Sequence, residues 1–332
     1  LALMPCSASA VVVDVKNGDV VALVSYPGYD NNRLTNDMDT EYYAKLALDQ
    51  SSPFFNKATQ QTTAPGSTLK LLSTIAGMEE GVIDEGTYIE CTGTFDYVDP
   101  PINCWNKDFF NMIGFQLGKV GDNEFSEVQS LSKLQEYASL IGLDQKTGIE
   151  LSEASPKVSD AKAVPSYMGQ GNNLFTTTQL ARYVTTVATS GNVFKLTLLD
   201  KVTDPKGEVL EEYEPELQDV VNISSNIWDV IHDGMRRVIQ THSQFDGLGV
   251  EVAGKTGTAE LDLRHPNHGL FIGYAPASDP EYAVAIRIAN GYSSGNACLI
   301  ANDTFKYMYN LADKDSILTG VASTDTSDTS ND

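Results

Sequence analysis

The sequence is poor in cysteine, in basic residues and in long apolar runs, and each shortage excludes a class of protein. Its four cysteines form no C-x-x-C pair, which argues against a structural zinc site. The 22 Lys and Arg residues face 45 Asp and Glu residues, and so acidic a chain would repel a nucleic-acid backbone. No apolar run reaches the roughly 18 residues that a membrane-spanning helix needs. Because the chain begins at Leu1, we expect a mature or excised piece, with any anchor or signal upstream.

Hydrophobic residues make up 41% of the chain, which is enough to bury a core over most of its length. The segment 314–332, rich in Ser, Thr and Asp, is instead expected to be disordered. Cys91 and Cys104 bracket a turn-rich stretch and fit either a disulfide or two buried thiols. His265 and His268 are interpreted as loop histidines rather than metal ligands, because no third ligand stands at a fitting spacing.

Hydrophobic patterning predicts strands at both ends of the chain and helices in the middle. Two β-branched runs, 10–15 and 19–25, are joined by Lys16-Asn17-Gly18, which favours a hairpin with a type I′ turn. Strand-like runs return at 250–259, 269–275 and 282–289. Helical patterns span 66–81, 108–117, 126–141, 173–188, 223–240 and 297–312. This order predicts one antiparallel sheet built from both chain ends, with a helical lobe at about 64–190 inserted between its strands.

Other segments are polar or short. Residues 27–63 show no periodicity and are interpreted as an irregular loop, and residues 82–106 as short strands and turns. Asp204-Pro205-Lys206-Gly207 predicts a second hairpin turn, and the acidic run Glu208–Glu216 is interpreted as a solvated edge. The pair Phe109-Phe110 is interpreted as part of the core rather than as a platform for substrate.

Several patterns suggest a nucleophilic serine. Gly291-Tyr292-Ser293-Ser294-Gly295 matches the nucleophile elbow G-x-S-x-G, but an elbow enzyme needs its histidine after the serine, and all four histidines precede Ser293. We therefore interpret it as a turn between a strand and a helix. The pattern S-x-x-K, in which the lysine can serve as base for the serine, occurs at Ser67–Lys70, Ser130–Lys133 and Ser159–Lys162.

Ser67 and Lys70 form the preferred pair because they open an apolar helix directly after Pro65-Gly66. Residues three apart on a helix share a face, so Lys70 can reach the Ser67 hydroxyl. The first turn offers unpaired N–H groups and the positive end of the helix dipole, which favour negative charge developing at the serine. A lysine desolvated in the protein centre loses its proton more easily and can act as a base. Ser130 lies within a helix and Ser159 in a polar loop, without this support.

The motif Lys-Thr-Gly strengthens this hypothesis. Lys255-Thr256-Gly257 lies within a strand-like run, where the glycine lets another backbone come close and the lysine and threonine can hold a carboxylate. A substrate peptide along this edge would gain main-chain hydrogen bonds by strand addition. The second copy, Lys146-Thr147-Gly148, is interpreted as a turn.

With these two motifs, the chain resembles the transpeptidase domain of class B penicillin-binding proteins, of the penicillin-binding protein 2 type. The resemblance rests on APGSTLK (64–70) and GKTGTAE (254–260), in the family's order, and covers about residues 8–312. Further similar segments are residues 10–32, 53–61, 169–183 and 268–286. The resemblance implies an α+β fold of the β-lactamase/transpeptidase type, with a central antiparallel sheet flanked by helices and an inserted all-helical lobe. Residues 10–313 would form this domain, and residues 1–9 would end an upstream linker.

The resemblance implies a peptidoglycan D,D-transpeptidase. Ser67 would attack the D-Ala-D-Ala carbonyl of a stem peptide with Lys70 as general base, and an amine of a neighbouring strand would then take the acyl group. The N–H groups of Ser67 and Thr258 would form the oxyanion hole. Four residues would bind the substrate, three of them at its carboxylate: Lys255, Thr256 and Thr258, with Gly257 beside them. β-Lactams would acylate Ser67 as substrate mimics.

The resemblance also implies that no cofactor and no metal take part. Stem peptides and β-lactams would be the ligands, and proteins of cell-wall elongation or division the partners. The protein would work on the extracytoplasmic face of the bacterial cell membrane, anchored by an N-terminal segment outside this sequence.

The sequence departs from the family at a third motif, S-x-N, expected just before the helix at 108–117. The chain reads Cys104-Trp105-Asn106 there, with Asn106 as the candidate for the motif's asparagine and Cys104 where the serine belongs. The segment is also shorter than in relatives, as if a mobile loop had been left out. Two other functions therefore stay open: a β-lactamase or β-lactam sensor of the same fold, and a non-catalytic domain that only binds division or elongation proteins.

Overall fold

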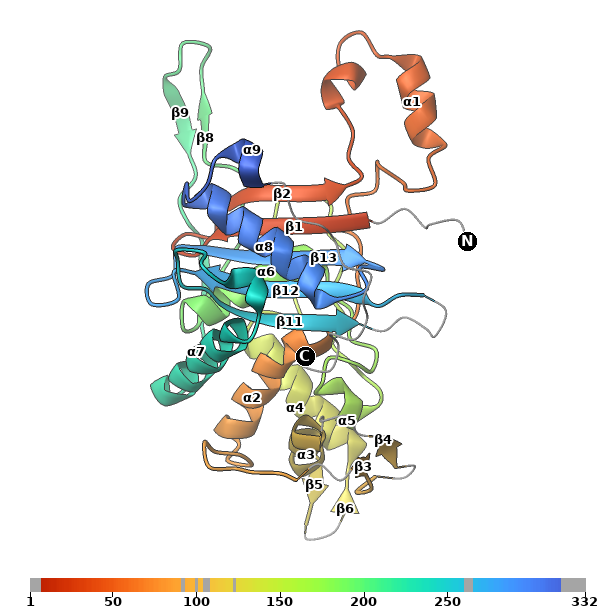
Figure 1. Ribbon diagram of the computed structural model, residues 1–332, viewed down its shortest axis with the longest axis vertical. Coiled ribbons are helices and arrows are strands. Elements are labelled where there is room, and N and C mark those ends of the chain that lie inside the picture. Colours follow the sequence, from red (N-terminus) through yellow and green to blue (C-terminus); the bar gives the residue numbers. More distant parts are fainter. Residues whose placement is uncertain are drawn as a thin grey trace.

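The centre of the molecule is a five-stranded antiparallel sheet (Figure 1). The computed structural model describes residues 7–90, 93–98, 101–103, 108–121, 124–259 and 265–317. The strands lie in the order β11 (Ala253–Ala259), β12 (His268–Ala275), β13 (Tyr282–Ala289), β1 (Ser7–Asp14) and β2 (Val20–Tyr26). Both ends of the chain therefore build one sheet, as the patterning predicts.

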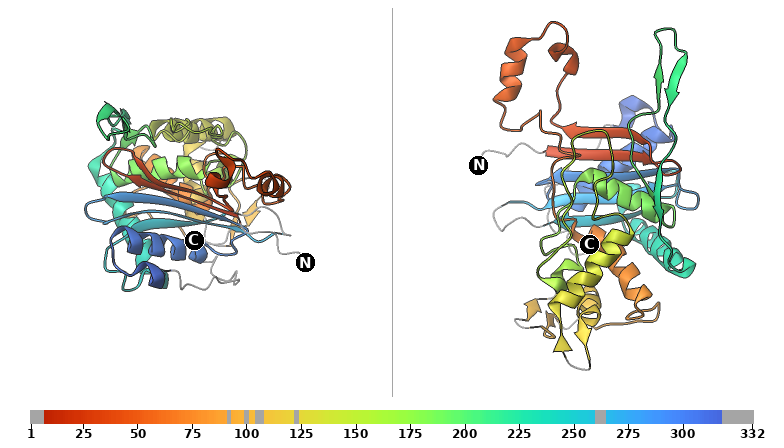
Figure 2. Two further views of the ribbon diagram at one scale, coloured as in Figure 1. Left: turned by 90° about the horizontal axis from the view of Figure 1, so that it is seen from above. Right: turned by 180° about the vertical axis from the view of Figure 1, so that it is seen from behind.

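Helices cover both faces of this sheet, as the view from above in Figure 2 shows. Helix α6 (Thr177–Ala188) packs against β13 and β1, and all of its residues are buried. Helix α8 (Ser294–Met308) packs on the opposite face against β12, and α7 (Ser225–Gln240) packs beside β11. The start of α6 is set by a capping box between Thr176 and Gln179, so the helix begins later than the predicted residue 173.

A lobe extends below the sheet in Figure 1. Its helical elements are η2 (Gly66–Leu69), α2 (Lys70–Glu79), α3 (Asp108–Leu117), α4 (Glu127–Leu140) and α5 (Ala163–Ser166). The lobe is not all-helical, because β3 (Thr94–Phe95) pairs with β4 (Ile102–Asn103) and β5 (Lys119–Val120) pairs with β6 (Glu124–Phe125). The predicted lobe range of 64–190 is also too long, since α6 packs on the central sheet.

Two segments project from the sheet at the β2 side (Figure 1). One carries η1 (Asn31–Leu34) and α1 (Thr40–Ala47), so the interpretation of residues 27–63 as irregular loop is wrong in part. The pattern misses α1 because Leu46 is its one buried residue, which leaves no apolar stripe to detect. Its start is nevertheless fixed by the side chain of Asp39, which accepts a hydrogen bond from the Tyr42 N–H.

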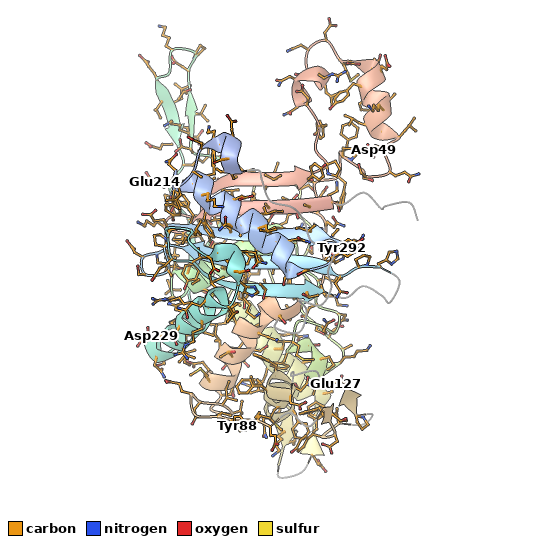
Figure 3. All side chains as sticks on the ribbon, viewed as in Figure 1. Asp49, Tyr88, Glu127, Glu214, Asp229 and Tyr292 are labelled. Atoms are coloured by element: carbon orange, nitrogen blue, oxygen red, sulfur yellow. The ribbon has the colours of Figure 1, made fainter. Side chains whose placement is uncertain are left out.

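The second projection is the predicted hairpin of β8 (Lys201–Thr203) and β9 (Val209–Glu212). It stands on a smaller pair formed by β7 (Asn192–Phe194) and β10 (Leu217–Val220). Residues 208–216 are all exposed, which confirms a solvated edge, and Figure 3 shows the side chains of Glu214 and Asp229 at the periphery of the molecule.

Local differences from the predictions have clear causes. In the β1–β2 connection only Gly18 has a positive φ, of 84°, so the turn is not type I′. Gly18 instead lets the turn pack on the carbonyl of Lys195, which a Cβ would approach to 2.7 Å. Strand β1 starts at Ser7, inside the stretch predicted as linker.

The end of the described chain also differs from the prediction. Lys314–Ile317 form a short helix, α9, with a buried Ile317, so these residues are not disordered. The remainder of the predicted tail, from residue 318, lies outside the described residues. No helix in the described part of the chain is long and apolar enough to cross a membrane.

Candidate active site

Ser67 lies in the short 3-10 turn η2 that leads into α2. The turn is held by the Thr68 hydroxyl, which donates to the Pro65 carbonyl at 2.8 Å. The N–H of Lys70, the first residue of α2, donates to the Ser67 carbonyl, so the two residues stand on consecutive turns. Only 8% of Ser67 and 7% of Lys70 is exposed. The turn therefore places a hydroxyl and an amine together in a shielded environment.

Strand β11 lies directly against this turn, because glycines on both sides allow a close approach. A Cβ on Gly66 would stand 2.5 Å from the Thr258 carbonyl oxygen. A Cβ on Gly257 would stand 2.8 Å from the Thr68 methyl group and 2.9 Å from the Pro65 carbonyl oxygen. The S-x-x-K and K-T-G motifs, far apart in sequence, thus meet backbone to backbone.

A third segment closes on the serine turn. The Gly66 N–H donates to the Gly169 carbonyl at 3.2 Å, and a Cβ on Gly169 would collide with the Gly66 carbonyl. Gly169 has a φ of 80°, which only glycine adopts without strain. Reasoning from the motifs did not assign this segment to the site, although Gly169-Gln170-Gly171 is a signal for close backbone approach.

Lys70 lies over an aromatic ring of the lobe. Its Nζ is 5.1 Å from the ring centroid of Phe110 in α3, within the range of a cation–π contact. Phe109 and Phe110 are partly buried against the main core, which confirms their interpretation as core residues. Phe110 additionally forms the wall of the site beside the lysine.

Lys255 is almost as buried as Lys70, with 8% exposed. Its Nζ donates to the Thr256 carbonyl at 3.1 Å and approaches the Thr256 hydroxyl at 3.4 Å. Thr256 is itself fully buried, whereas Thr258 is partly exposed. Thr258 is therefore the threonine of this motif that can meet a ligand directly, while Thr256 holds the lysine.

Tyr183 of α6 ties the serine turn to the centre of the molecule. Its hydroxyl accepts from the Leu72 N–H at 2.9 Å and donates to the Thr68 carbonyl at 3.3 Å. Burial raises the pKa of this phenol, so it stays protonated and keeps both bonds. The motifs did not single out Tyr183, because a tyrosine within an apolar helix looks like core.

The competing serines have structural roles. The Ser130 hydroxyl is buried and donates to the Gly114 carbonyl at 2.7 Å. Ser159 is also buried, and its hydroxyl forms hydrogen bonds with the Ala161 carbonyl and the Asn172 side-chain oxygen. Ser293 caps α8 by accepting from the Gly295 N–H at 3.0 Å, which confirms the predicted turn between a strand and a helix. Thr147 of the other Lys-Thr-Gly copy is buried, and its N–H and hydroxyl both donate hydrogen bonds to the Glu153 carboxylate.

In the part of the chain that is described, no group of three or more potential metal ligands occurs around the histidines or elsewhere. His268 is not a loop residue, because it opens β12. Its Nδ1 accepts from the Asn290 N–H at 3.0 Å. Burial, assisted by Arg287, lowers the pKa of His268 to about 4, so the ring is neutral at pH 7.

Some predicted residues lie outside the described part of the chain. Asn106 and Cys104, the candidates for the third motif, are among them, and so is the Cys91–Cys104 pair. Helix α3 begins at Asp108, where the resemblance implies a helix just after the third motif.

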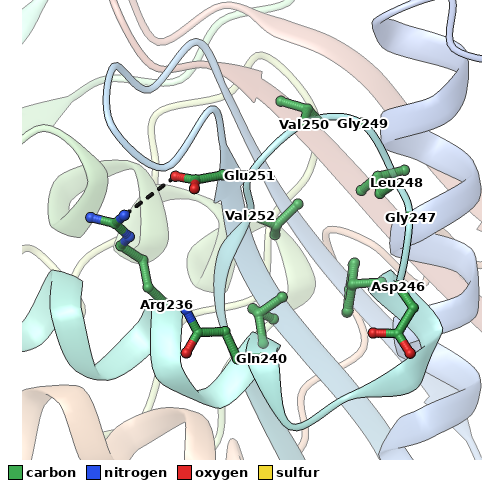
Figure 4. Close-up of a pocket in the computed structure, with 11 residues that line it drawn as sticks. Arg236, Gln240, Asp246, Gly247, Leu248, Gly249, Val250, Glu251 and Val252 are labelled. Atoms are coloured by element: carbon green, nitrogen blue, oxygen red, sulfur yellow. Dashed lines mark hydrogen bonds and ion pairs between the residues drawn. The ribbon is translucent and has the colours of Figure 1, made fainter.

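A pocket of about 480 Å³ lies at the other end of β11 and holds none of the candidate residues (Figure 4). Buried apolar side chains, including Phe245 and Val252, line it, and an ion pair of 3.3 Å between Arg236 and Glu251 crosses one side. The shielded residues Ser67, Lys70 and Lys255 lie outside this pocket.

Comparisons with known proteins identify the family of the chain. The family model described as penicillin binding protein transpeptidase domain matches residues 8–309. Peptidoglycan D,D-transpeptidase MrdA of Acinetobacter baumannii is 26% identical over 342 residues, covering 90% of this chain and 50% of its own. The chain thus spans about half the length of this curated relative.

Two solved structures show the same fold. The penicillin G acyl-enzyme complex of penicillin-binding protein A from M. tuberculosis superposes with a TM-score of 0.76 at 23% identity, covering 93% of this chain and 75% of that one. The complex between penicillin-binding protein PBP2 and MreC from Helicobacter pylori gives 0.75 at 20% identity, covering 92% and 60%. From its fold and its family match, the chain belongs to the penicillin-binding protein transpeptidase domain family.

Proposed function

We propose that this chain is the catalytic domain of a peptidoglycan D,D-transpeptidase that works through an acyl-Ser67 intermediate. The observation that carries the proposal is the seating of the Ser67 turn against β11, with Lys70 and Lys255 buried beside it. The name of the A. baumannii relative supports the reaction class.

In the first step Ser67 Oγ attacks the carbonyl of the penultimate D-Ala of a stem peptide. Lys70, as the neutral amine, takes the hydroxyl proton, and the C–N bond to the terminal D-Ala breaks with a proton delivered to the departing amine. Burial favours the neutral form of a lysine, and Lys70 is 7% exposed. Asn106 is proposed to contribute at this step as the asparagine of the third motif.

The oxyanion of the tetrahedral intermediate is held by the N–H groups of Ser67 and Thr258. The close contact of Gly66 with the Thr258 carbonyl supports this pairing, because it keeps both backbones adjacent. The substrate carboxylate is bound by Lys255 and Thr258, with Thr256 holding the lysine and Gly257 admitting the turn. In the second step an amine of a neighbouring strand attacks the ester and releases Ser67.

β-Lactams acylate the same serine, which the acyl-enzyme complex of the M. tuberculosis relative supports. The partner proteins belong to the cell-wall elongation or division machinery, which the PBP2–MreC complex supports. We place the domain on the extracytoplasmic side of the membrane, where its stem-peptide substrates lie, anchored by a segment outside the sequence given.

A transpeptidation assay tests the proposal. With a diacyl-Lys-D-Ala-D-Ala peptide and an added amine acceptor, wild-type protein should release D-Ala and form the amide product. Ser67→Ala should abolish both, because it removes the hydroxyl that forms the acyl ester. The control Ser132→Ala, an exposed serine on α4, should leave both rates unchanged.

The lysine is tested in the same assay, and the rival functions are tested with penicillin. Lys70→Met should slow acylation by about 10²- to 10⁴-fold, as loss of a general base does. Rapid hydrolysis of a penicillin adduct without amide product would favour a β-lactamase. Equal retention of a fluorescent penicillin by wild type and Ser67→Ala would contradict the assignment of Ser67 and favour a binding domain.

A further inference from the structure

Arg287, in the middle strand β13, is buried with one of its donor nitrogens left without a partner. Only 1% of the residue is exposed. Its Nη1 donates to the Gln61 side-chain oxygen at 2.9 Å, but its Nε is buried with no hydrogen-bond partner among the described residues. A guanidinium has five N–H donors and no acceptor, so this side chain calls for further acceptors.

The equally buried Arg182 shows what a satisfied arginine looks like in this protein. Only 2% of it is exposed, and it donates to the carbonyls of Gly142, Gln145 and Lys146 and to the Gln218 side chain. Arg182 is therefore saturated with acceptors, and Arg287 is not.

The surroundings of Arg287 add positive charge and donors rather than acceptors. Lys57 is 4% exposed, and its Nζ donates a hydrogen bond to the Ser52 carbonyl. Burial and the charge of Arg287 both lower the pKa of this lysine. Gln61 belongs to the same covering segment, 57–63, in which the hydroxyls of Thr59 and Thr63 are buried without partners.

His268 lies on the same side of the sheet. Arg287 stands opposite Leu270 of β12, and His268 is two residues along that strand, so the alternation of side chains puts both on one face. Its Nδ1 accepts the Asn290 N–H, which leaves the proton of the neutral ring on Nε2 as one more donor.

No carboxylate forms an ion pair with these cations within the described ranges, although Asp49 acts on Lys57 from a greater distance. None of the ion pairs there includes Arg287 or Lys57. Burying unpaired charge is strongly unfavourable, and buried charges in proteins are paired or otherwise bound. Surplus donors around a buried cation therefore call for a ligand that only accepts hydrogen bonds.

We propose that a small monovalent anion of the size of chloride binds at the Arg287 guanidinium, between β13 and the segment 57–63. A halide fits this chemistry because it carries one negative charge, accepts several hydrogen bonds and offers no donor. Larger carboxylates fit poorly, because Arg287 is 1% exposed. Through His268, which pairs with Ala259 next to Thr258, the bound anion would steady the end of β11 at the candidate active site.

Crystallography with bromide tests the site directly. In crystals of the wild-type protein grown with sodium bromide, an anomalous peak should lie within hydrogen-bonding reach of Arg287 Nε. Absence of a peak there, or a carboxylate of the chain on the guanidinium, would overturn the proposal. This measurement needs no variant and is independent of the proposed catalytic function.

Thermal unfolding gives a second test. The wild-type Tm should be higher in sodium chloride than in sodium gluconate of equal ionic strength, by about 3 °C at saturation. Arg287→Met should lose this Tm difference between the two salts. The control Arg182→Met should lower Tm in both salts but keep the difference between them. Equal wild-type Tm values in the two salts, or an undiminished difference in Arg287→Met, would contradict the site.

Discussion

Three residues of the candidate site, Ser67, Lys70 and Lys255, are each more than nine-tenths buried. Lysine is almost never that buried unless it is paired or used, since desolvating an ammonium is unfavourable. Lys255 is held by Thr256, and Lys70 lies over the ring of Phe110. Two buried lysines, one in the serine turn and one in the strand that packs on it, are hard to explain as a device for stability alone, because apolar residues would pack there at lower cost.

His268 gives a prediction about pH at the residue scale. Its pKa is about 4 in the folded state, against about 6.5 in the unfolded chain, so the unfolded chain binds more protons between these values. The free energy of unfolding should therefore decrease as pH falls from 6.5 to 4, and this residue should account for up to about 3 kcal/mol of the decrease. Urea unfolding in gluconate buffer at several pH values measures it.

The matched variant is His268→Asn, whose side-chain oxygen can replace Nδ1 as acceptor for the Asn290 N–H. This variant should lose stability less steeply over the same pH range. A slope identical to that of the wild type would show that His268 does not titrate as described.

The places of the two motifs in the fold could be predicted from their spacing, whereas the catalytic roles of their residues stay predictions. Ser67 and Lys70 follow from a helix start after Pro65-Gly66, and Lys255 from a glycine within a strand. Tyr183 and Gly169 could not be predicted in this way. Their roles depend on hydrogen bonds to a turn more than a hundred residues earlier in the chain, and no local pattern records such a contact.

At the scale of elements, the contact between η2 and β11 is the feature on which the site depends. Gly257→Ala would place a methyl group 2.8 Å from the Thr68 side chain and 2.9 Å from the Pro65 carbonyl. The strand would have to move off the serine turn, and displacements of this size can slow a reaction by about 10²-fold. Stopped-flow acylation by a fluorescent penicillin measures the rate.

Gly234→Ala is the control for this substitution. Gly234 is exposed on α7, and a Cβ there meets nothing within 4 Å. Alanine should stabilise the helix by about 0.5–1 kcal/mol and leave acylation unchanged. An unchanged acylation rate in Gly257→Ala would mean that the strand does not need its close approach to the serine.

The elements themselves could be predicted where an apolar pattern was strong. Helix α2 is an example, since its buried side includes Leu72 and Ile75. Helix α1 could not be predicted, because it projects from the body and buries Leu46 alone. The start of α6 depends on a capping box whose Thr and Gln also fit an interior helical turn.

At the scale of the whole molecule, the sheet joins the first and last parts of the chain around the inserted lobe. Pairing of β1 with β13 explains why the patterning placed the sheet correctly, since β1 carries the apolar run 10–13 and β13 the apolar run 282–286. The extent of the lobe could not be read in the same way, because the apolar positions of α6, such as Leu180, Val184 and Val187, do not show whether the helix packs on the lobe or on the sheet. The consequence for function is that the serine turn sits at the junction of lobe and sheet.

The most direct measurement maps the penicillin adduct. Trypsin should release residues 58–70 as one peptide, in which Ser67 is the only serine. After brief exposure of the intact protein to benzylpenicillin, tandem mass spectrometry should find one added penicilloyl group on this peptide, at Ser67. An adduct on another peptide, such as 288–306 with Ser293, or no adduct at all, would contradict the account.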